Sequence, residues 1–149
     1  MFPVRVSVFV DAPLADMWHA LADLPSHTLW MADAVAIRFP AGQTAGSGTV
    51  MDVDTRIGPF RLTDRMEVTR WFPPRSIEVA HQGLIRGQGR FDLAPMAGGI
   101  RFTWTEELRF PWWLGGPLTA LLARPVLAFV WRRNLRRFQA MMEGRLSGR

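Results

Sequence analysis

The segment between residues 49 and 110 constrains the fold most, because it has the pattern of several strands in succession. Apolar and polar side chains alternate along it, as they do in strands that bury one face. Turn signals divide it at Gly58-Pro59, Pro73-Pro74, Gly83 and Gly98-Gly99. We predict strands over residues 49–57, 60–72, 76–82, 86–95 and 100–110, arranged as an antiparallel meander.

Two more strands and two short helices are predicted before this segment. Residues 4–10 and 35–39 alternate in the manner of strands. Between them, Asp11 stands at a helix-start signal, and apolar residues then recur at helical spacing until Pro25. Residues 26–35 are typical of a second short helix.

The C-terminal segment, from Leu118 to Gly144, is predicted to be one long helix. Pro125 is expected to kink or interrupt this helix, or to mark its true start. The apolar side chains recur every three to four residues and form one stripe along the helix. The stripe contains Trp131, Leu135, Phe138, Met142 and Leu146.

The order of these elements predicts an α+β fold in a single domain over residues 1–149. A length of 149 residues suits one domain with a real core. A curved antiparallel sheet of six to seven strands would wrap around the long C-terminal helix. The space inside such a grip is often larger than its side chains can fill, so we expect an apolar cavity between sheet and helix.

Several local motifs resemble the START-like, or SRPBCC, superfamily, whose helix-grip fold has this order of elements. They are "VSVFVDAPLADMWHALAD", "HTLWMADAV", "GSGTV", "VTRWFPPRSIEV" and "FDLAPMAGGIRFTWTEEL". The superfamily includes lipid-transfer START domains, the major birch pollen allergen, and bacterial polyketide cyclases and dehydrases. The resemblance implies a cavity that holds a hydrophobic small molecule. It implies no catalytic residue, because unrelated functions share this scaffold.

Glu106 interrupts the apolar row of the segment 100–110. Its neighbours in that row include Phe102, Trp104 and Leu108, which are expected to line the cavity. Burial disfavours the charged form of a carboxylate, so Glu106 could act as a general acid or base near neutral pH. Alternatively, Glu106 pairs with an arginine, or a bulge turns it toward solvent.

Asp64 interrupts a second apolar row, and His81 lies at the end of a third. The row around Asp64 contains Phe60, Leu62 and Met66. A cavity histidine could exchange protons near pH 7, although a histidine at a strand end is more often a rim residue. If Asp64, His81 and Glu106 converge, they form a plausible acid–base site, and these three are the predicted catalytic residues.

The predicted ligand-binding residues are large apolar side chains expected to face the cavity. They are Trp30, Phe60, Leu62, Met66, Phe91, Phe102, Trp104, Leu108 and Phe129. No metal and no cofactor are predicted, since the chain has no cysteine and its three histidines are scattered. The absence of lysine excludes a Schiff-base side chain, and no GxSxG motif supports a serine hydrolase.

Charge is concentrated at the C-terminus. Residues 124–149 hold seven arginines and one acid, whereas residues 1–123 hold eleven arginines and twelve acids. The aromatic stripe of this helix indicates an inner face that closes the cavity, so nucleic-acid binding is not predicted. A weak contact with a membrane surface is a further expectation, because Trp112 and Trp113 lie close to the basic helix.

The leading functional prediction is the binding of a lipid, polyketide or aromatic metabolite. The alternatives are an enzyme of the polyketide cyclase or dehydratase type, and a peripheral membrane-surface protein. No signal peptide or membrane span is recognised, which favours a cytoplasmic location. A basic content made entirely of arginine is typical of a GC-rich bacterial genome. The oligomeric state stays open.

Overall fold

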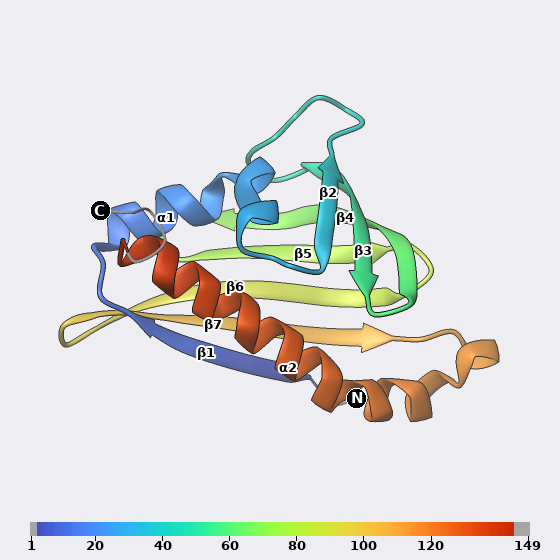
Figure 1. The fold of residues 1–149 in the computed structure, drawn as a ribbon. Coiled ribbons are helices and arrows are strands. Elements are labelled where there is room, and N and C mark those ends of the chain that lie inside the picture. Colours follow the sequence, from blue (N-terminus) through green and yellow to red (C-terminus); the bar gives the residue numbers. More distant parts are fainter. Residues whose placement is uncertain (1–2, 145–149) are drawn as a thin grey trace.

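Seven strands form one antiparallel sheet in the computed structural model, which describes residues 3–144 (Figure 1). The sheet has the order β1-β7-β6-β5-β4-β3-β2, so every strand from β2 to β6 pairs with its successor, and β7 also pairs with β1. The bounds are β1 Val4–Val10, β2 Ala34–Arg38, β3 Val50–Ile57, β4 Phe60–Phe72, β5 Ser76–Gln82, β6 Arg86–Met96 and β7 Gly99–Arg109. The predicted meander is confirmed, and so is the α+β helix-grip architecture.

The helical elements agree with the prediction in order but not in every boundary. They are α1 Leu14–Ala22, the 3-10 helices η1 Leu24–Leu29 and η2 Trp112–Leu114, and α2 Gly116–Met142. The second helix, expected over residues 26–35, is wrong in extent. Pro25 lies in its first turn, where a missing N–H costs nothing, and Ala34 already pairs with Thr55 of β3.

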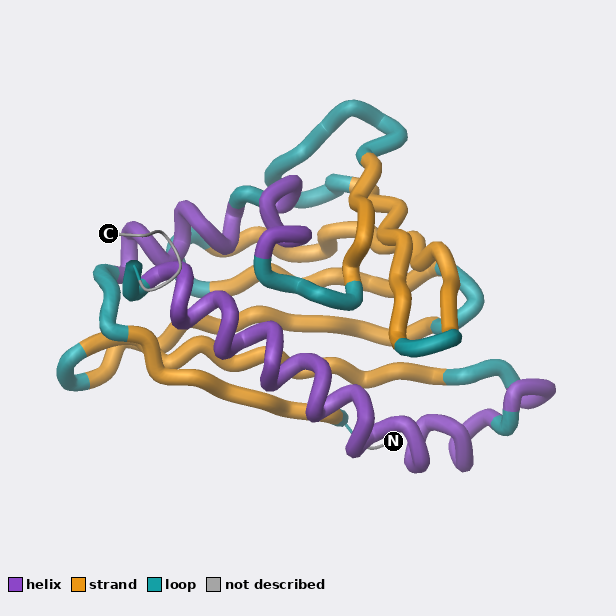
Figure 2. Tube along the Cα trace, in the orientation of Figure 1, coloured by secondary structure: helices purple, strands orange, loops and turns teal. Residues whose placement is uncertain are grey.

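The long helix α2 lies across one side of the curled sheet, and its first turns extend beyond the sheet near the end of β7 (Figures 1 and 2). Pro125 lies inside the helix and does not mark its start. Of the predicted inner stripe, Trp131, Leu135 and Phe138 are buried. Leu146 lies outside the described residues, as do Arg145 and Arg149.

Aromatic side chains join the helix to the sheet. Phe138 of α2 packs edge-on against Trp30 and Phe102, with ring centroids 5.0 Å apart in both pairs. Trp131 stacks on Trp104 at 5.0 Å. Such aromatic contacts add to the large apolar area that these side chains remove from water, so they hold α2 over the inner face of the sheet.

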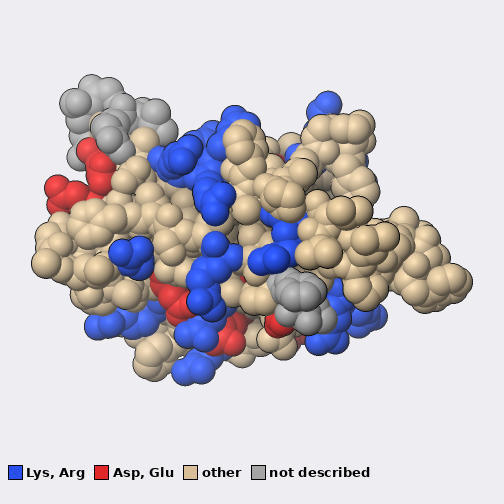
Figure 3. Space-filling view, turned by 90° about the horizontal axis from the view of Figure 1, so that it is seen from below, with Lys and Arg blue, Asp and Glu red and all other residues tan. Residues whose placement is uncertain are grey.

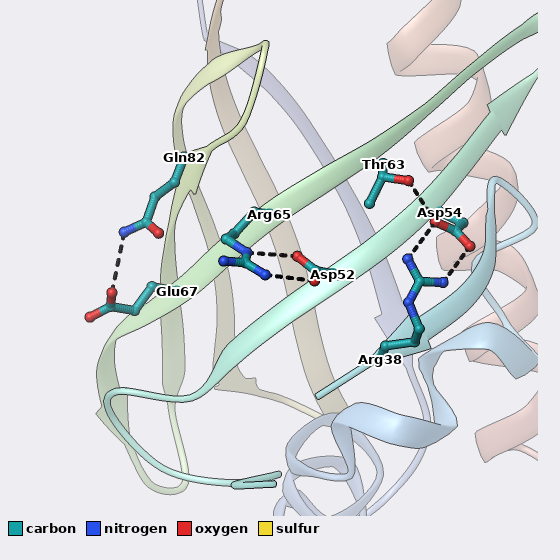
Figure 4. Close-up of polar contacts among 7 residues, drawn as sticks. All are labelled: Arg38, Asp52, Asp54, Thr63, Arg65, Glu67 and Gln82. Atoms are coloured by element: carbon teal, nitrogen blue, oxygen red, sulfur yellow. Dashed lines mark hydrogen bonds and ion pairs between the residues drawn. The ribbon is translucent and has the colours of Figure 1, made fainter. Parts of the chain in front are cut away.

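The outer face of the sheet carries polar pairs (Figure 4). Arg65 donates two hydrogen bonds to Asp52, and Arg38 donates two to Asp54. Hydrogen bonds from Arg38 and Thr63 lower the pKa of Asp54 to about 2. Asp52 and Asp54 alternate along β3 with the buried Met51 and Val53, so β3 turns its apolar side chains inward.

Candidate functional site

A pocket of about 390 Å³ lies between the inner face of the sheet, the segment from η1 to β2, and the first half of α2. Its lining is mostly apolar. Representative residues are Ile37, Val53, Leu62, Met66, Val79 and Leu108 from the strands, and Ala123, Val126 and Leu127 from α2. The polar side chains of the lining include Asp64, His81 and Glu106.

These three polar residues converge into one buried array. His81 Nδ1 lies 2.7 Å from Asp64 Oδ2, and His81 Nε2 lies 2.7 Å from Glu106 Oε2. Trp104 Nε1 donates a third hydrogen bond to Glu106 Oε1 at 3.2 Å. The imidazole is therefore held between two carboxylates, and no arginine of residues 3–144 takes part in the contacts of this array.

The register of the sheet brings the array together. Met66 of β4 lies opposite His81 of β5, so Asp64 is a diagonal neighbour of His81 on the same face. Glu106 lies on β7, two strands away from His81, with β6 between them. On β6 the residues opposite His81 and Glu106 are Gly87 and Gly89.

Gly89 leaves the space through which Glu106 reaches His81. A Cβ atom at position 89 would lie 2.4 Å from Glu106 Oε1 and 2.9 Å from its Cδ atom. Those distances are far inside van der Waals contact, so any side chain at position 89 would displace the carboxylate. Sequence reasoning missed this residue, although glycine inside a strand is a known signal of such a close approach.

The two carboxylates of the array control the pKa of His81. Burial alone would lower the pKa of His81, but the negative charge of Glu106 and the hydrogen bonds to Asp64 and Glu106 outweigh it and raise that pKa to about 10. His81 is therefore an imidazolium at neutral pH, and each ring N–H donates to a carboxylate. Asp64 Oδ1 is buried and has no hydrogen-bond partner among the described residues.

Two further polar groups line the pocket on the side of η1. Burial lowers the pKa of His27 to about 4, and its Nε2 donates to the carbonyl oxygen of Leu21 at 2.7 Å. Burial also raises the pKa of Asp33, which accepts a 2.6 Å hydrogen bond from Asn134 of α2. His27 is thus neutral at pH 7, in contrast to His81.

Six of the nine predicted ligand-binding residues line the pocket. They are Phe60, Leu62, Met66, Phe91, Trp104 and Leu108. Trp30 and Phe102 are fully buried in the core and do not contribute to the lining. The predicted position of Phe129 is wrong, because 60% of this residue is exposed. It follows the lining residue Leu127 by two positions, which is a rotation of about 200° around a helix.

The model of the family described as "Polyketide cyclase / dehydrase and lipid transport" matches residues 1–145. The chain belongs to that family. Comparison with curated proteins gives no match.

Solved structures share the fold of this family member. The di-domain ARO/CYC StfQ from the steffimycin biosynthetic pathway is 18% identical with a TM-score of 0.76, over 97% of this chain and 51% of that one. The chain thus spans about half the length of StfQ. A START superfamily protein from Mycobacterium smegmatis is 16% identical with a TM-score of 0.69, over 95% of this chain and 97% of that one.

The exposed tryptophans and the arginines bear on the predicted contact with a membrane surface. Trp112 and Trp113 of η2 are 86% and 60% exposed. Arginines gather over the middle of the face shown in Figure 3. Among residues 3–144 no helix is long and apolar enough to cross a membrane, and no three acidic or histidine side chains are grouped to hold a metal ion. Membrane contact, the absence of nucleic-acid binding and the cytoplasmic location stay predictions.

Proposed function

We propose that the protein binds a hydrophobic small molecule, of the lipid, polyketide or aromatic-metabolite class, in the pocket between the sheet and α2. The observation that carries this proposal is the buried array of Asp64, His81 and Glu106 in an otherwise apolar lining. Burying charges is expensive, and apolar side chains of similar volume usually serve stability as well or better. A perturbed histidine in a pocket is a common mark of a functional site.

The size and the lining of the pocket support the same proposal. A volume of about 390 Å³ falls within the roughly 300–1,000 Å³ of typical small-molecule sites. Family membership and the resemblance to START-like proteins favour an apolar guest. The polar array would face one polar group of that guest, while the apolar walls would bury the rest.

Filling the pocket tests this proposal. Ala123 lines the pocket from α2, so Ala123→Trp places an indole in the space that a guest would use. We expect the affinity for the neutral dye N-phenyl-1-naphthylamine, measured by its fluorescence, to fall by about tenfold or more, a change of ~1.4 kcal/mol. The matched control is Leu121→Trp on the exposed side of the same helix, which should bind the dye like the wild type. Equal affinities for the two variants would contradict the proposal.

A second candidate is an enzyme of the cyclase or dehydratase type, favoured by the convergence of the three predicted catalytic residues. In the array His81 has both ring nitrogens engaged, and each oxygen of Glu106 accepts a hydrogen bond. Asp64 lines the pocket, and its Oδ1 atom accepts no hydrogen bond from the residues that the structure describes, so Asp64 is the proposed general base. The imidazolium of His81 would position and stabilise both carboxylates.

Elimination of water from an aryl β-hydroxyketone tests the enzymatic candidate. Asp64 would take the proton next to the carbonyl, and that proton and the hydroxyl group would leave together as water. We expect 4-hydroxy-4-phenylbutan-2-one to yield its enone, followed by ultraviolet absorbance, and Asp64→Asn to slow the reaction by about 100-fold or more. Dye binding should change by less than about threefold. A wild-type rate no faster than buffer would rule out this candidate and leave the binding function standing.

A further inference from the structure

Exposed apolar side chains gather on η2 and on the first half of α2. Of the fifteen large apolar side chains that are exposed among residues 3–144, eight lie between positions 112 and 129. A single exposed apolar residue is ordinary on a protein surface, but a contiguous patch usually marks an interaction site. We call this surface the apolar face, and its most exposed members are Trp112, Trp113, Leu118, Leu122 and Phe129.

Helical spacing places the apolar face in line with three arginines. Leu118, Leu122 and Phe129 follow one another at intervals of four and seven residues, so they lie on one side of α2. The same side continues with three exposed arginines, which are Arg132, Arg133 and Arg136. None of the three forms an ion pair with a residue of the described range 3–144. The Arg133 guanidinium lies 5.8 Å from the centroid of the Phe129 ring, so the apolar and basic parts are in contact.

The charge on this part of the chain has one sign. Residues 108–142 contain six arginines and no acidic residue. The second half of α2 is therefore complementary to an anionic surface, whereas the first half is complementary to hydrocarbon. Helices that bind at a membrane interface combine these two properties, with apolar side chains among the lipids and basic side chains near anionic head groups. Tryptophan, which is present twice in η2, favours this interface.

The apolar face is continuous with the wall of the pocket. Val126 of α2 lines the pocket and is nevertheless 52% exposed. Phe110, Thr119 and Ala123 of the same segment also line the pocket. The first turns of α2 extend beyond the sheet, which leaves the apolar face open to a flat surface (Figures 1 and 2). At such a surface, an apolar guest could pass between lipid and pocket with little contact with water.

We propose that the apolar face and the three arginines of α2 dock the protein on an anionic lipid surface, with the exposed pocket wall at Val126 turned toward the bilayer. The choice of a lipid partner rests on the proposed binding function, because a hydrophobic guest partitions from water into the apolar interior of a bilayer. An acidic protein or a second copy of this chain would leave the continuity between the apolar face and the pocket without a purpose.

Co-sedimentation with lipid vesicles tests the docking of the wild-type protein. Vesicles of equal parts phosphatidylcholine and phosphatidylglycerol are anionic, whereas vesicles of phosphatidylcholine alone have no net charge. We expect the affinity for the anionic vesicles to be about tenfold or more above that for the neutral ones at low salt. At about 1 M salt this affinity should fall by about fivefold or more, because salt screens exposed charges. Equal affinities for the two vesicles, or no binding to either, would overturn the proposal.

One pair of variants tests the apolar part. Trp112→Ser combined with Trp113→Ser removes two exposed side chains, and we expect the affinity for the anionic vesicles to fall by about tenfold or more. The control is Phe72→Ser, which removes an apolar side chain that is 52% exposed on β4, three strands away from β7. The control should bind these vesicles like the wild type. Wild-type affinity in the tryptophan variant would contradict docking through the apolar face.

A second pair tests the basic part. Arg132→Gln combined with Arg136→Gln should reduce the ratio of the affinities for anionic and neutral vesicles by about tenfold or more. The control, Arg75→Gln combined with Arg101→Gln, removes the same charge from exposed positions outside α2, and its ratio should change by less than about threefold. Equal reductions in the two double variants would show that net charge alone, and not the arginines of α2, attracts the protein to the lipid.

Two measurements without vesicles separate this proposal from its alternatives. If the protein binds N-phenyl-1-naphthylamine but not the anionic vesicles, the docking is wrong while the binding function stands. If the vesicles bind and the dye does not, the binding function fails while the docking stands. Analytical ultracentrifugation tests a second copy as the partner. A wild-type dimer that the two tryptophan substitutions dissociate, together with no vesicle binding, would overturn the proposal in favour of self-association.

Discussion

Replacement of Glu106 by alanine is expected to lower the free energy of unfolding by about 3 to 5 kcal/mol, the usual cost of removing one member of a buried ion pair. The Glu106 side chain is 8% exposed, and its partner His81 is 5% exposed. Without Glu106, the imidazolium keeps only Asp64, and Trp104 loses the acceptor for its indole N–H. Urea denaturation followed by circular dichroism measures the loss.

The next residue along the strand supplies the matched control. Glu107 points to the opposite face of β7 and is only partly buried, so Glu107→Ala should change the free energy of unfolding by less than about 0.5 kcal/mol. Gly89→Ala tests the same array without changing any of its members, because the new Cβ atom would collide with the Glu106 carboxylate. Overpacking of this kind costs about 1 to 3 kcal/mol. Equal, small losses for Glu106→Ala and Glu107→Ala would show that the array does not form.

Stability is expected to fall on both sides of a maximum near pH 6.5, because two histidines are shifted in opposite directions. The pKa of His81 is raised from 6.5 to about 10 in the folded state. A raised pKa means that the folded state binds the proton more tightly than the unfolded chain. The stabilisation by His81 is thus complete below pH 6.5 and is lost as the pH rises through about 10.

His27 produces the acidic limb of the same curve. Burial lowers the pKa of His27 from 6.5 to about 4. Between pH 4 and pH 6.5, His27 is therefore protonated in the unfolded chain and neutral in the folded state. The free energy of unfolding should therefore decrease by about 3 kcal/mol as the pH falls across this window, at 1.36 kcal/mol per pKa unit. His27→Gln should lose this part of the acidic limb and keep the alkaline one.

Nuclear magnetic resonance of the imidazole protons distinguishes His81 from His27. His81 should stay protonated to about pH 9 or beyond, and His27 should stay neutral down to about pH 5, from their pKa values of about 10 and about 4. A His81 signal that loses its proton near pH 6.5, the usual pKa of a histidine side chain, would contradict an imidazolium held between two carboxylates.

The strands were predictable because their signal is local. Alternation along residues 60–72 and 76–82 depends only on neighbours in the chain, and the structure has strands at those bounds. The second short helix was less predictable, because pairing of Ala34 with β3 competes with helix formation there. Tertiary pairing outweighs a weak local preference at such a boundary.

The members of the candidate site were predictable one at a time. Asp64 and Glu106 each stand out as an acid in an apolar row, and His81 follows an apolar row of its own. Their meeting was not predictable, because it depends on the register of β4, β5 and β7 and on the missing side chain at Gly89. Phe129 was misplaced for a similar reason, since the rotation of α2 about its axis is decided by what the helix packs against.

The amino-acid sequence by itself determined which segments become strands and helices, and which face of each strand carries the acids, because side-chain periodicity is a property of the local backbone. Only the tertiary structure decided that one imidazole lies between two carboxylates beside an open apolar pocket. Distances across four neighbouring strands depend on the register of the sheet and on the space that a glycine leaves. The periodicity of a single strand carries no information about either.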